Sequence, residues 1–232
     1  MEPRHVVAMG GGGWTMDDPG LDRFVVSLTG ARRPRICFVP TASGDHPASE
    51  GFHDAFPASG FDASILWLFD RTVADLGSFL GEQDIVYVGG GNTVSMLAVW
   101  RAHGVDRALR DAYDRGVVMA GMSAGANCWF EASTTDSYQL GRADPLIDGL
   151  GFVPGSFTPH YGSEPARRPA VLELVASGAL PAGYACDDYA AVHIADGGLR
   201  EAVASRPGAR AFRVEPEDGR TREEPLTVRP LA

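Results

Sequence analysis

Val117-Val118-Met119-Ala120-Gly121-Met122-Ser123-Ala124-Gly125-Ala126-Asn127 is the stretch that decides how the rest of this sequence is interpreted. Gly121 and Gly125 lie two residues on either side of Ser123, which is the G-x-S-x-G spacing of a serine on a strained strand-to-helix turn. Glycine is needed at both places because a side chain would collide where the turn packs on neighbouring strands. The pattern predicts a buried strand, a sharp turn that exposes the Ser123 hydroxyl, and a helix whose unpaired amides favour negative charge nearby.

Chain length and charge limit the classes to which the protein can belong. The chain has 232 residues, of which 44% are hydrophobic, so it can bury a full core and is long for one domain but short for two. We expect a single domain over residues 1–232, with a strand-and-tail appendage at about 209–232. The net charge of −10 disfavours nucleic acid and anionic membrane surfaces as partners. The apolar run from Val6 to Gly10 is too short for a signal peptide or a membrane span, which predicts a cytoplasmic protein.

Neither the cysteines nor the glycine runs indicate a metal or a nucleotide cofactor. Cys37, Cys128 and Cys186 have no metal-type spacing and lie among apolar or small residues, so we expect buried thiols. The run Gly10–Gly13 lacks the G-x-G-x-x-G frame of dinucleotide-binding proteins, and no lysine follows Gly89–Gly91 as it would in a phosphate-binding loop. We therefore predict no cofactor and no metal site.

Short apolar segments alternate with helix-like segments through the first half of the chain. The strand-like segments are His5–Met9, Arg35–Val39, Ser64–Leu68, Asp84–Val88 and Val117–Ala120. The helix-like segments begin near Pro19, near Pro47 (to about Ser59) and at Met96 (to Arg115, broken around Gly104). This alternation predicts right-handed crossovers and an α/β fold, a three-layer sandwich with a mostly parallel central sheet.

The loops that follow these strands should meet at one edge of the sheet, where open parallel sheets carry their working sites. They are Gly10–Gly13, Thr41–Asp45, Gly89–Asn92 and the Ser123 turn. The second half is less regular, and its expected elements are a helix at about Ala166–Ser177 and strands near Ala190–Ala195 and Ala209–Val214.

A serine nucleophile needs a base, and His160 is the strongest candidate among six histidines. It stands in Phe157-Thr158-Pro159-His160-Tyr161-Gly162, at the expected end of a strand and fixed by proline. His46, after the Thr41 loop, is the second candidate. The others lie in strand-like or helical stretches, where a structural or solvated role is expected: His5, His53, His103 and His193.

The glycines at 89–91 have a further use as backbone donors. Glycine lets the main chain approach a substrate carbonyl closely, so a free amide of Gly90 or Gly91, together with the amide of Ala124, is a candidate oxyanion hole. The plainer interpretation is a tight strand-to-helix turn, and the two are compatible.

Four motifs together resemble the peptidase E group of serine peptidases, which also includes cyanophycinase. They occur in the order of that family, over roughly residues 5–195: Pro40-Thr41-Ala42, Gly89-Gly90-Gly91-Asn92-Thr93, Gly121–Ala126 and Thr158-Pro159-His160-Tyr161. The resemblance implies a fold related to class I glutamine amidotransferases, with Ser123 as nucleophile and His160 as base. It also implies a small peptide substrate, since peptidase E cleaves dipeptides with an amino-terminal aspartate.

The acid that completes such a triad is left open between two positions. The resemblance offers an acid shortly after the serine, matched loosely by Asp136, or a glutamate near a later strand, matched in position by Asp188, where aspartate is a departure. The residues themselves favour Asp188, because it lies between apolar segments that should hold its backbone. Asp187 would face the opposite side of an extended chain, and Asp136 lies in a polar stretch, 132–137, that is more typical of a turn.

Two adjacent arginines raise the question of substrate charge. Arg167 and Arg168 follow His160 closely and are candidates for binding an acidic side chain through paired hydrogen bonds. The alternative is a solvated helix start in which they pair with Glu164 or Glu173.

The sequence therefore predicts a serine peptidase that acts on small peptides through an acyl-enzyme on Ser123. The alternative is a non-catalytic or differently acting amidotransferase-like binding protein that retains the serine turn. An esterase of the α/β-hydrolase type is disfavoured, because its histidine comes late in the chain and 72 residues follow His160 here. We expect a monomer or a homodimer.

Overall fold

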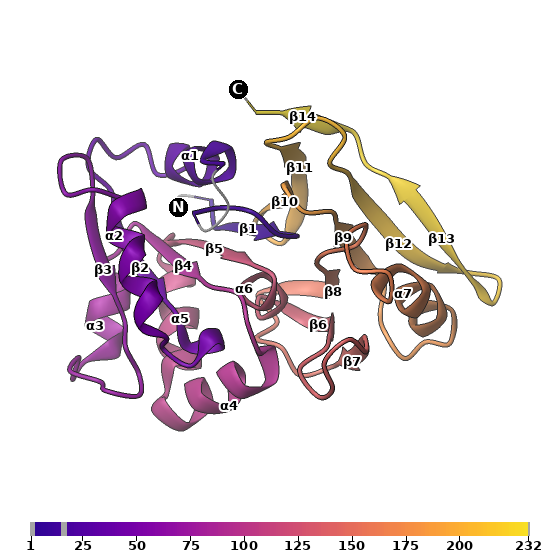
Figure 1. Cartoon of the computed structure of the whole chain (residues 1–232), viewed down its shortest axis with the longest axis horizontal. Coiled ribbons are helices and arrows are strands. Elements are labelled where there is room, and N and C mark those ends of the chain that lie inside the picture. Colours follow the sequence, from indigo (N-terminus) through magenta and orange to yellow (C-terminus); the bar gives the residue numbers. More distant parts are fainter. Residues whose placement is uncertain (1–2, 15–17, 232) are drawn as a thin grey trace.

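The computed structural model describes residues 3–14 and 18–231 of the chain. Its strands form two sheets, and helices flank the larger one on both faces (Figure 1). The predicted α/β class with a mostly parallel main sheet is confirmed. The second sheet was not expected from the sequence.

The main sheet has eight strands in the order β14-β11-β10-β1-β5-β4-β2-β3. Neighbouring strands from β3 to β1 are parallel, β10 and β11 are antiparallel additions, and β14 runs parallel to β11. The bounds are β1 His5–Met9, β2 Arg35–Val39, β3 Asp62–Ile65, β4 Ile85–Val88, β5 Val118–Met122, β10 Ala190–Ala195, β11 Gly198–Ala204 and β14 Val228–Pro230.

The second sheet has six strands in the order β13-β12-β9-β8-β6-β7. They are β6 Phe130–Thr135, β7 Asp144–Leu146, β8 Val153–Thr158, β9 Gly183–Cys186, β12 Ala211–Glu217 and β13 Arg220–Pro225. The interpretation of 132–137 as a turn was wrong, since most of that stretch is the end of β6. Its polar side chains are buried in the sheet, where the hydroxyl of Thr134 donates to that of Thr158 on β8 at 3.1 Å.

The helices follow the predicted pattern in part. They are α1 Gly20–Ser27, α2 Phe52–Ala55, α3 Leu76–Gly81, α4 Thr93–His103, α5 Val105–Asp114, α6 Ala124–Asn127 and α7 Arg167–Ala176. Gly104 adopts φ 75° between α4 and α5, which is the break that the sequence indicates. The helix expected over 47–59 is instead a 3-10 segment, Pro47–Gly51, followed by the single turn α2, and α3 was not anticipated. A further 3-10 turn covers Thr41–Ser43.

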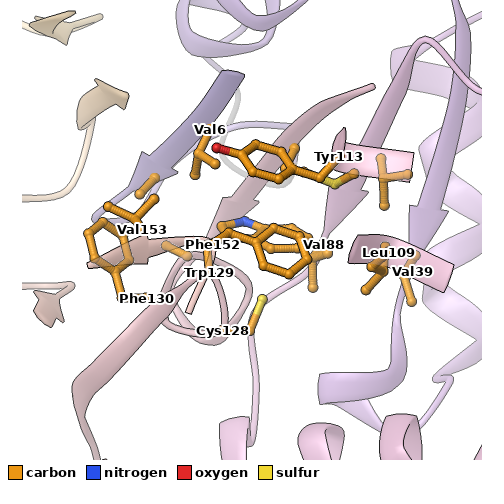
Figure 2. Packing of buried hydrophobic residues seen from close by; sticks show 14 of the residues in the cluster. Val6, Val39, Val88, Leu109, Tyr113, Cys128, Trp129, Phe130, Phe152 and Val153 are labelled. Carbon is orange, nitrogen blue, oxygen red and sulfur yellow. The ribbon is translucent and has the colours of Figure 1, made fainter. Parts of the chain in front are cut away.

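Two hydrophobic clusters cover the faces of the main sheet. On one face, alternate residues of β1, β2, β4 and β5 pack against α1 and α2. On the other face, the intervening residues pack against α3, α4 and α5, and this cluster continues into the second sheet. Figure 2 shows that junction, where Val6 of β1 and Tyr113 of α5 lie near Trp129, Phe130 and Val153. The two sheets therefore share one core.

The last part of the chain belongs to both sheets. β12 lies between β9 and β13, whereas β14 returns to the edge of the main sheet beside β11 (Figure 1). Among the described residues, no helix is long and apolar enough to cross a membrane.

We predict that Phe157→Ala lowers the free energy of unfolding by about 3–5 kcal/mol, because it empties a fully buried site in the shared core. The ring of Phe157 stacks on that of Phe130 with centroids 5.2 Å apart. Denaturant unfolding measures the change, and Ile147→Ala, at a side chain that is 73% exposed, is the control expected to stay within about 0.5 kcal/mol. Equal effects of the two changes would contradict a core shared between the sheets.

Candidate active site

Ser123 occupies a sharp turn between β5 and α6. Its backbone has φ 54° and ψ −116°, a region that costs a non-glycine residue on the order of 1–3 kcal/mol. Hydrogen bonds hold this conformation: the amide of Ser123 donates to the carbonyl of Met9 at 3.1 Å, and its carbonyl accepts from Ala126 and Asn127 at 3.0 Å. The strained turn is the geometry that the glycine spacing predicts.

The glycines around Ser123 allow a close packing of main chain on main chain. A Cβ on Gly125 would lie 2.3 Å from the carbonyl oxygen of Val88, and a Cβ on Gly121 would lie 2.2 Å from that of Gly125. The helix α6 is a single turn, shorter than the small helix-forming residues suggested. Its influence on Ser123 therefore comes from its first amides rather than from a long helix dipole.

His160 and Asp188 are in contact. Nδ1 of His160 lies 2.6 Å from Oδ1 of Asp188, which leaves Nε2 of the imidazole free to face another group. Burial alone would raise the pKa of the Asp188 carboxyl, but hydrogen bonds from His160 and from the Ser163 hydroxyl outweigh it and hold that pKa below its ordinary value. Asp188 is therefore a charged acceptor at neutral pH, and its bond to His160 weakens only as the pH falls through the lowered pKa.

The end of β1 brings these residues to one place. The carbonyl of Met9 accepts a hydrogen bond from the amide of Ser123 at 3.1 Å, and the carbonyl of Gly10 accepts one from the amide of His160 at 3.2 Å. The carbonyl of Gly11 accepts one from the amide of Tyr189, the residue after Asp188, at 2.8 Å. A Cβ on Gly11 would lie 2.2 Å from Oδ1 of Asp188 and 3.1 Å from Cε1 of His160.

The sequence analysis missed the part played by Met9, Gly10 and Gly11. The glycine run after the first strand was expected to lie at the working edge of the sheet, but its carbonyls were not expected to bind the segments of Ser123, His160 and Asp188. A glycine run after a strand also allows other main-chain segments to approach closely, and here it does so.

The rival candidates for base and acid have other contacts. Nδ1 of His46 accepts from the amide of Ala48 at 3.1 Å and caps the 3-10 segment. Asp187 pairs with Arg210, with 2.9 Å between Oδ2 and Nε. Asp136 pairs with Arg167 at 3.4 Å and is not in contact with His160 among the interactions of the described residues.

The loop after β4 packs directly against Ser123. A Cβ on Gly90 would lie 3.4 Å from the Cβ of Ser123, and Gly91 has φ 136°, close against the carbonyl of Ala42. Within residues 3–14 and 18–231, the backbone amides of Gly90 and Gly91 meet no acceptor. Ala124 begins α6, so its amide has no partner inside that helix. These amides are available to an oxygen atom near Ser123.

A pocket of about 440 Å³ opens beside Ser123, and we call it the Ser123 pocket. Three of its lining side chains are charged and in mutual contact: Arg167 donates to Glu164 at 2.6 Å and lies 3.4 Å from Asp136. Arg167 is itself buried and also donates to the carbonyl of Thr134 at 3.0 Å. Its pairing with Glu164 is the alternative that the sequence left open.

Arg168 is not part of the Ser123 pocket. Its guanidinium donates twice to Glu223 of β13, at 2.7 and 2.9 Å, and is largely exposed. The sequence analysis did not anticipate that the segment 136–140, between β6 and β7, lines the pocket together with Glu164. No local pattern marks that segment, since its role depends on the second sheet.

Comparison with known proteins identifies the family of the chain. The sequence pattern of the family described as Peptidase family S51 matches residues 6–202. The chain belongs to peptidase family S51. An uncharacterized peptidase, YgaJ, of Bacillus subtilis is 45% identical over 233 residues, which cover 98% of this chain and 99% of that protein. The resemblance to the peptidase E group is thereby confirmed, and the chain is an enzyme of the peptidase class.

More distant relatives of this S51 peptidase match over about half of their length. Peptidase E of Streptomyces coelicolor is 32% identical over 131 residues, 55% of this chain and 51% of that protein. A probable alpha-aspartyl dipeptidase of Drosophila melanogaster is 30% identical over 131 residues, 54% of this chain and 52% of that protein.

Two solved structures share the fold of this S51 peptidase. A peptidase from an acI-B1 actinobacterium superposes with a TM-score of 0.70 at 16% identity, over 98% of this chain and 96% of that one. A putative peptidase E protein from Listeria monocytogenes gives 0.61 at 19% identity, over 88% and 98%.

Metal ligands are not clustered in the described part of this S51 peptidase. Over residues 3–14 and 18–231, no group of three or more His, Cys, Asp or Glu side chains is placed to hold a metal ion. The three cysteines are buried, and burial raises the pKa of Cys37 to about 12, which keeps that thiol protonated.

We predict that Asp188→Asn lowers kcat for peptide hydrolysis by orders of magnitude, because an amide keeps the contact with His160 but does not stabilise a charged imidazolium. Asp187→Asn is the matched control, and it should alter stability through Arg210 rather than kcat. Asp136→Asn should act mainly on KM, through the Ser123 pocket. Steady-state kinetics distinguish these results, and a larger loss of kcat in Asp136→Asn than in Asp188→Asn would transfer the role to Asp136.

Proposed function

We propose that this S51 peptidase is a serine peptidase that hydrolyses small peptides through an acyl-enzyme on Ser123. The single observation that carries the proposal is the convergence of Ser123, His160 and the Asp188 segment on three consecutive carbonyls at the end of β1. That arrangement holds a nucleophile, a base and an orienting acid on rigid elements, as nucleophilic catalysis requires.

The first half of the reaction forms the acyl-enzyme. Oγ of Ser123 attacks the peptide carbonyl carbon while Nε2 of His160 takes the hydroxyl proton, since Nδ1 is bound to Asp188. Asp188 stabilises the imidazolium. The C–N bond then breaks, and His160 gives the proton to the leaving amine.

The second half releases the acyl group by hydrolysis. Nε2 of His160 takes a proton from a water molecule whose oxygen attacks the ester carbonyl, and the proton returns to Oγ of Ser123 as the ester bond breaks. In both halves, negative charge develops on the former carbonyl oxygen. The amides of Ala124 and of Gly90 or Gly91 are its proposed donors, since they lie beside Ser123 with free N–H groups.

The Ser123 pocket is proposed to bind the amino-terminal residue of the peptide. Its two carboxylates, Asp136 and Glu164, exceed its single guanidinium, Arg167, so it suits a free amino group. Dipeptides with an amino-terminal aspartate are candidate substrates, but their side chain must compete with Asp136 and Glu164 for Arg167. We therefore expect hydrolysis of such dipeptides without a strong preference for aspartate.

We predict that Ser123→Ala, His160→Ala and the double variant lose similar activity, each on the order of 10³-fold or more, because the two groups act as one unit. Hydrolysis of a dipeptide panel measures the loss, and a fluorophosphonate should label the wild type and not Ser123→Ala. Circular dichroism serves as the folding control. A double variant whose loss is the product of the two single losses, or an active wild type that is not labelled, would refute the acyl-enzyme on Ser123. Either result would favour a binding protein that only retains the turn.

We predict that kcat/KM for Asp-Leu exceeds that for Asn-Leu and Ala-Leu by less than about tenfold, because the guanidinium of Arg167 is already paired with two carboxylates. Arg168→Ala should leave these ratios unchanged, since Arg168 pairs with Glu223. A preference of a hundredfold or more that vanishes in Arg167→Gln and survives in Arg168→Ala would instead assign an acidic specificity to Arg167.

A further inference from the structure

A second pocket, of about 480 Å³, adjoins the Gly89–Gly91 loop, and Gly89 and Gly90 are part of its lining. Its lining includes Gly90 and Met122, each of which directly precedes a residue that lines the Ser123 pocket, namely Gly91 and Ser123. The serine turn and the Gly89–Gly91 loop therefore contribute residues to both pockets. A short peptide whose scissile carbonyl lies over Ser123 can extend into both.

The walls of this second pocket are aromatic and fixed in place, so we call it the aromatic pocket. The ring of Trp14 packs edge-on against that of Phe38 with centroids 5.1 Å apart, and Phe38 stacks on Phe52 at 4.8 Å. Met122 completes the apolar wall. Because these rings are held by one another, an entering apolar side chain meets a preformed surface, which reduces the entropy lost on binding.

The charges of the two pockets differ. In the described part of the chain, the lining of the aromatic pocket contains no Asp, Glu, Lys or Arg, whereas Asp136, Glu164 and Arg167 line the Ser123 pocket. Of the polar side chains that line the aromatic pocket, the hydroxyl of Ser43 already donates to the carbonyl of Pro40, and we take His46 as the group that directs a ligand. Its Nδ1 accepts from the amide of Ala48, so the proton of the neutral ring is on Nε2, which can donate to an anion.

We propose that the aromatic pocket binds the residue that leaves in the first half of the reaction. Its apolar side chain packs against Trp14, Phe38 and Met122, and its α-carboxylate accepts a hydrogen bond from Nε2 of His46. The substrate class is thereby a dipeptide with a free amino end in the Ser123 pocket and a large apolar second residue. This inference rests on the proposed function, because it takes Ser123 as the attacked position.

The side-chain part of the inference is tested with Ala-Leu, Ala-Phe and Ala-Gly. In the wild type, kcat/KM should be about ten- to a hundredfold higher for the first two, because each buries an apolar side chain. Ala48→Trp places a bulky ring at an exposed position in the lining, so it should lower kcat/KM for Ala-Leu and Ala-Phe more than for Ala-Gly and thereby remove this advantage. Equal rates for the three dipeptides, or an advantage unaffected by Ala48→Trp, would overturn the proposal.

The carboxylate part is tested with Ala-Leu and its carboxyl-terminal amide. His46→Ser keeps an oxygen that can cap the 3-10 segment but removes the imidazole. The wild type should prefer the free acid by about tenfold, and His46→Ser should lose that preference. His53→Ser, at an exposed histidine outside the pocket lining, is the matched control. If His46→Ser and the wild type prefer the free acid equally, His46 does not bind the α-carboxylate and this part of the proposal is refuted.

Binding to the Ser123→Ala variant separates this inference from the proposed function. Calorimetry of Ala-Leu and Ala-Gly with that variant reports the aromatic pocket without any turnover. Ala-Leu should bind this variant more tightly than Ala-Gly does, and the double variant Ser123→Ala/Ala48→Trp should lose that difference. This result would support the pocket even if fluorophosphonate fails to label the wild type. If the wild type is labelled and hydrolyses both dipeptides, but the two do not differ in binding or rate, the serine mechanism is supported. The proposed role of the aromatic pocket is then refuted.

Discussion

The hydrogen bonds from three separate chain segments to Met9, Gly10 and Gly11 are the constraint on which the site depends. The three segments come from different parts of the fold. Ser123 follows β5 of the main sheet, His160 follows β8 of the second sheet, and Tyr189 lies in the link between β9 and β10. Consecutive carbonyls set the spacing of the three segments along one strand end. Ser123 and His160 both have a strained φ of 54°. These hydrogen bonds, together with the packing of main chain around the glycines, hold both residues in that conformation.

The placement of the site also determines its electrostatics. Ser123, the proposed nucleophile, and its neighbour Met122 line two pockets of different character, one with two carboxylates and a guanidinium and the other neutral and aromatic. A zwitterionic dipeptide has a matching polarity from its amino end to its carboxyl end. In our proposal, these two surfaces together bind the substrate and align its scissile bond.

Much of the main sheet could be read from the sequence, because its strands are short apolar runs bounded by turn residues. The expected bounds of His5–Met9, Arg35–Val39 and Ala190–Ala195 are those of β1, β2 and β10. The second sheet could not be found as a sheet in this way, although the strand expected near Ala209–Val214 is confirmed in part as its β12. Its strands bury threonine and serine, and Thr134 and Thr158 satisfy each other only after β6 and β8 have paired. Hydropathy does not report such pairing. The candidate site followed from local spacing at Ser123 and His160, whereas the bonds to the glycine run join residues more than a hundred positions apart.

The course of the chain after Cys186 has a consequence for how the enzyme loses its structure. From β9 to β14 the chain passes between the two sheets three times, at 186–190, 204–211 and 225–228, and the link that carries Asp188 is the first of these passages. Because the sheets share a core and are joined by three passages of the chain, opening of one sheet removes packing from the other, and we expect their unfolding to be coupled. Loosening of either sheet therefore also disturbs the link that carries Asp188, between β9 and β10.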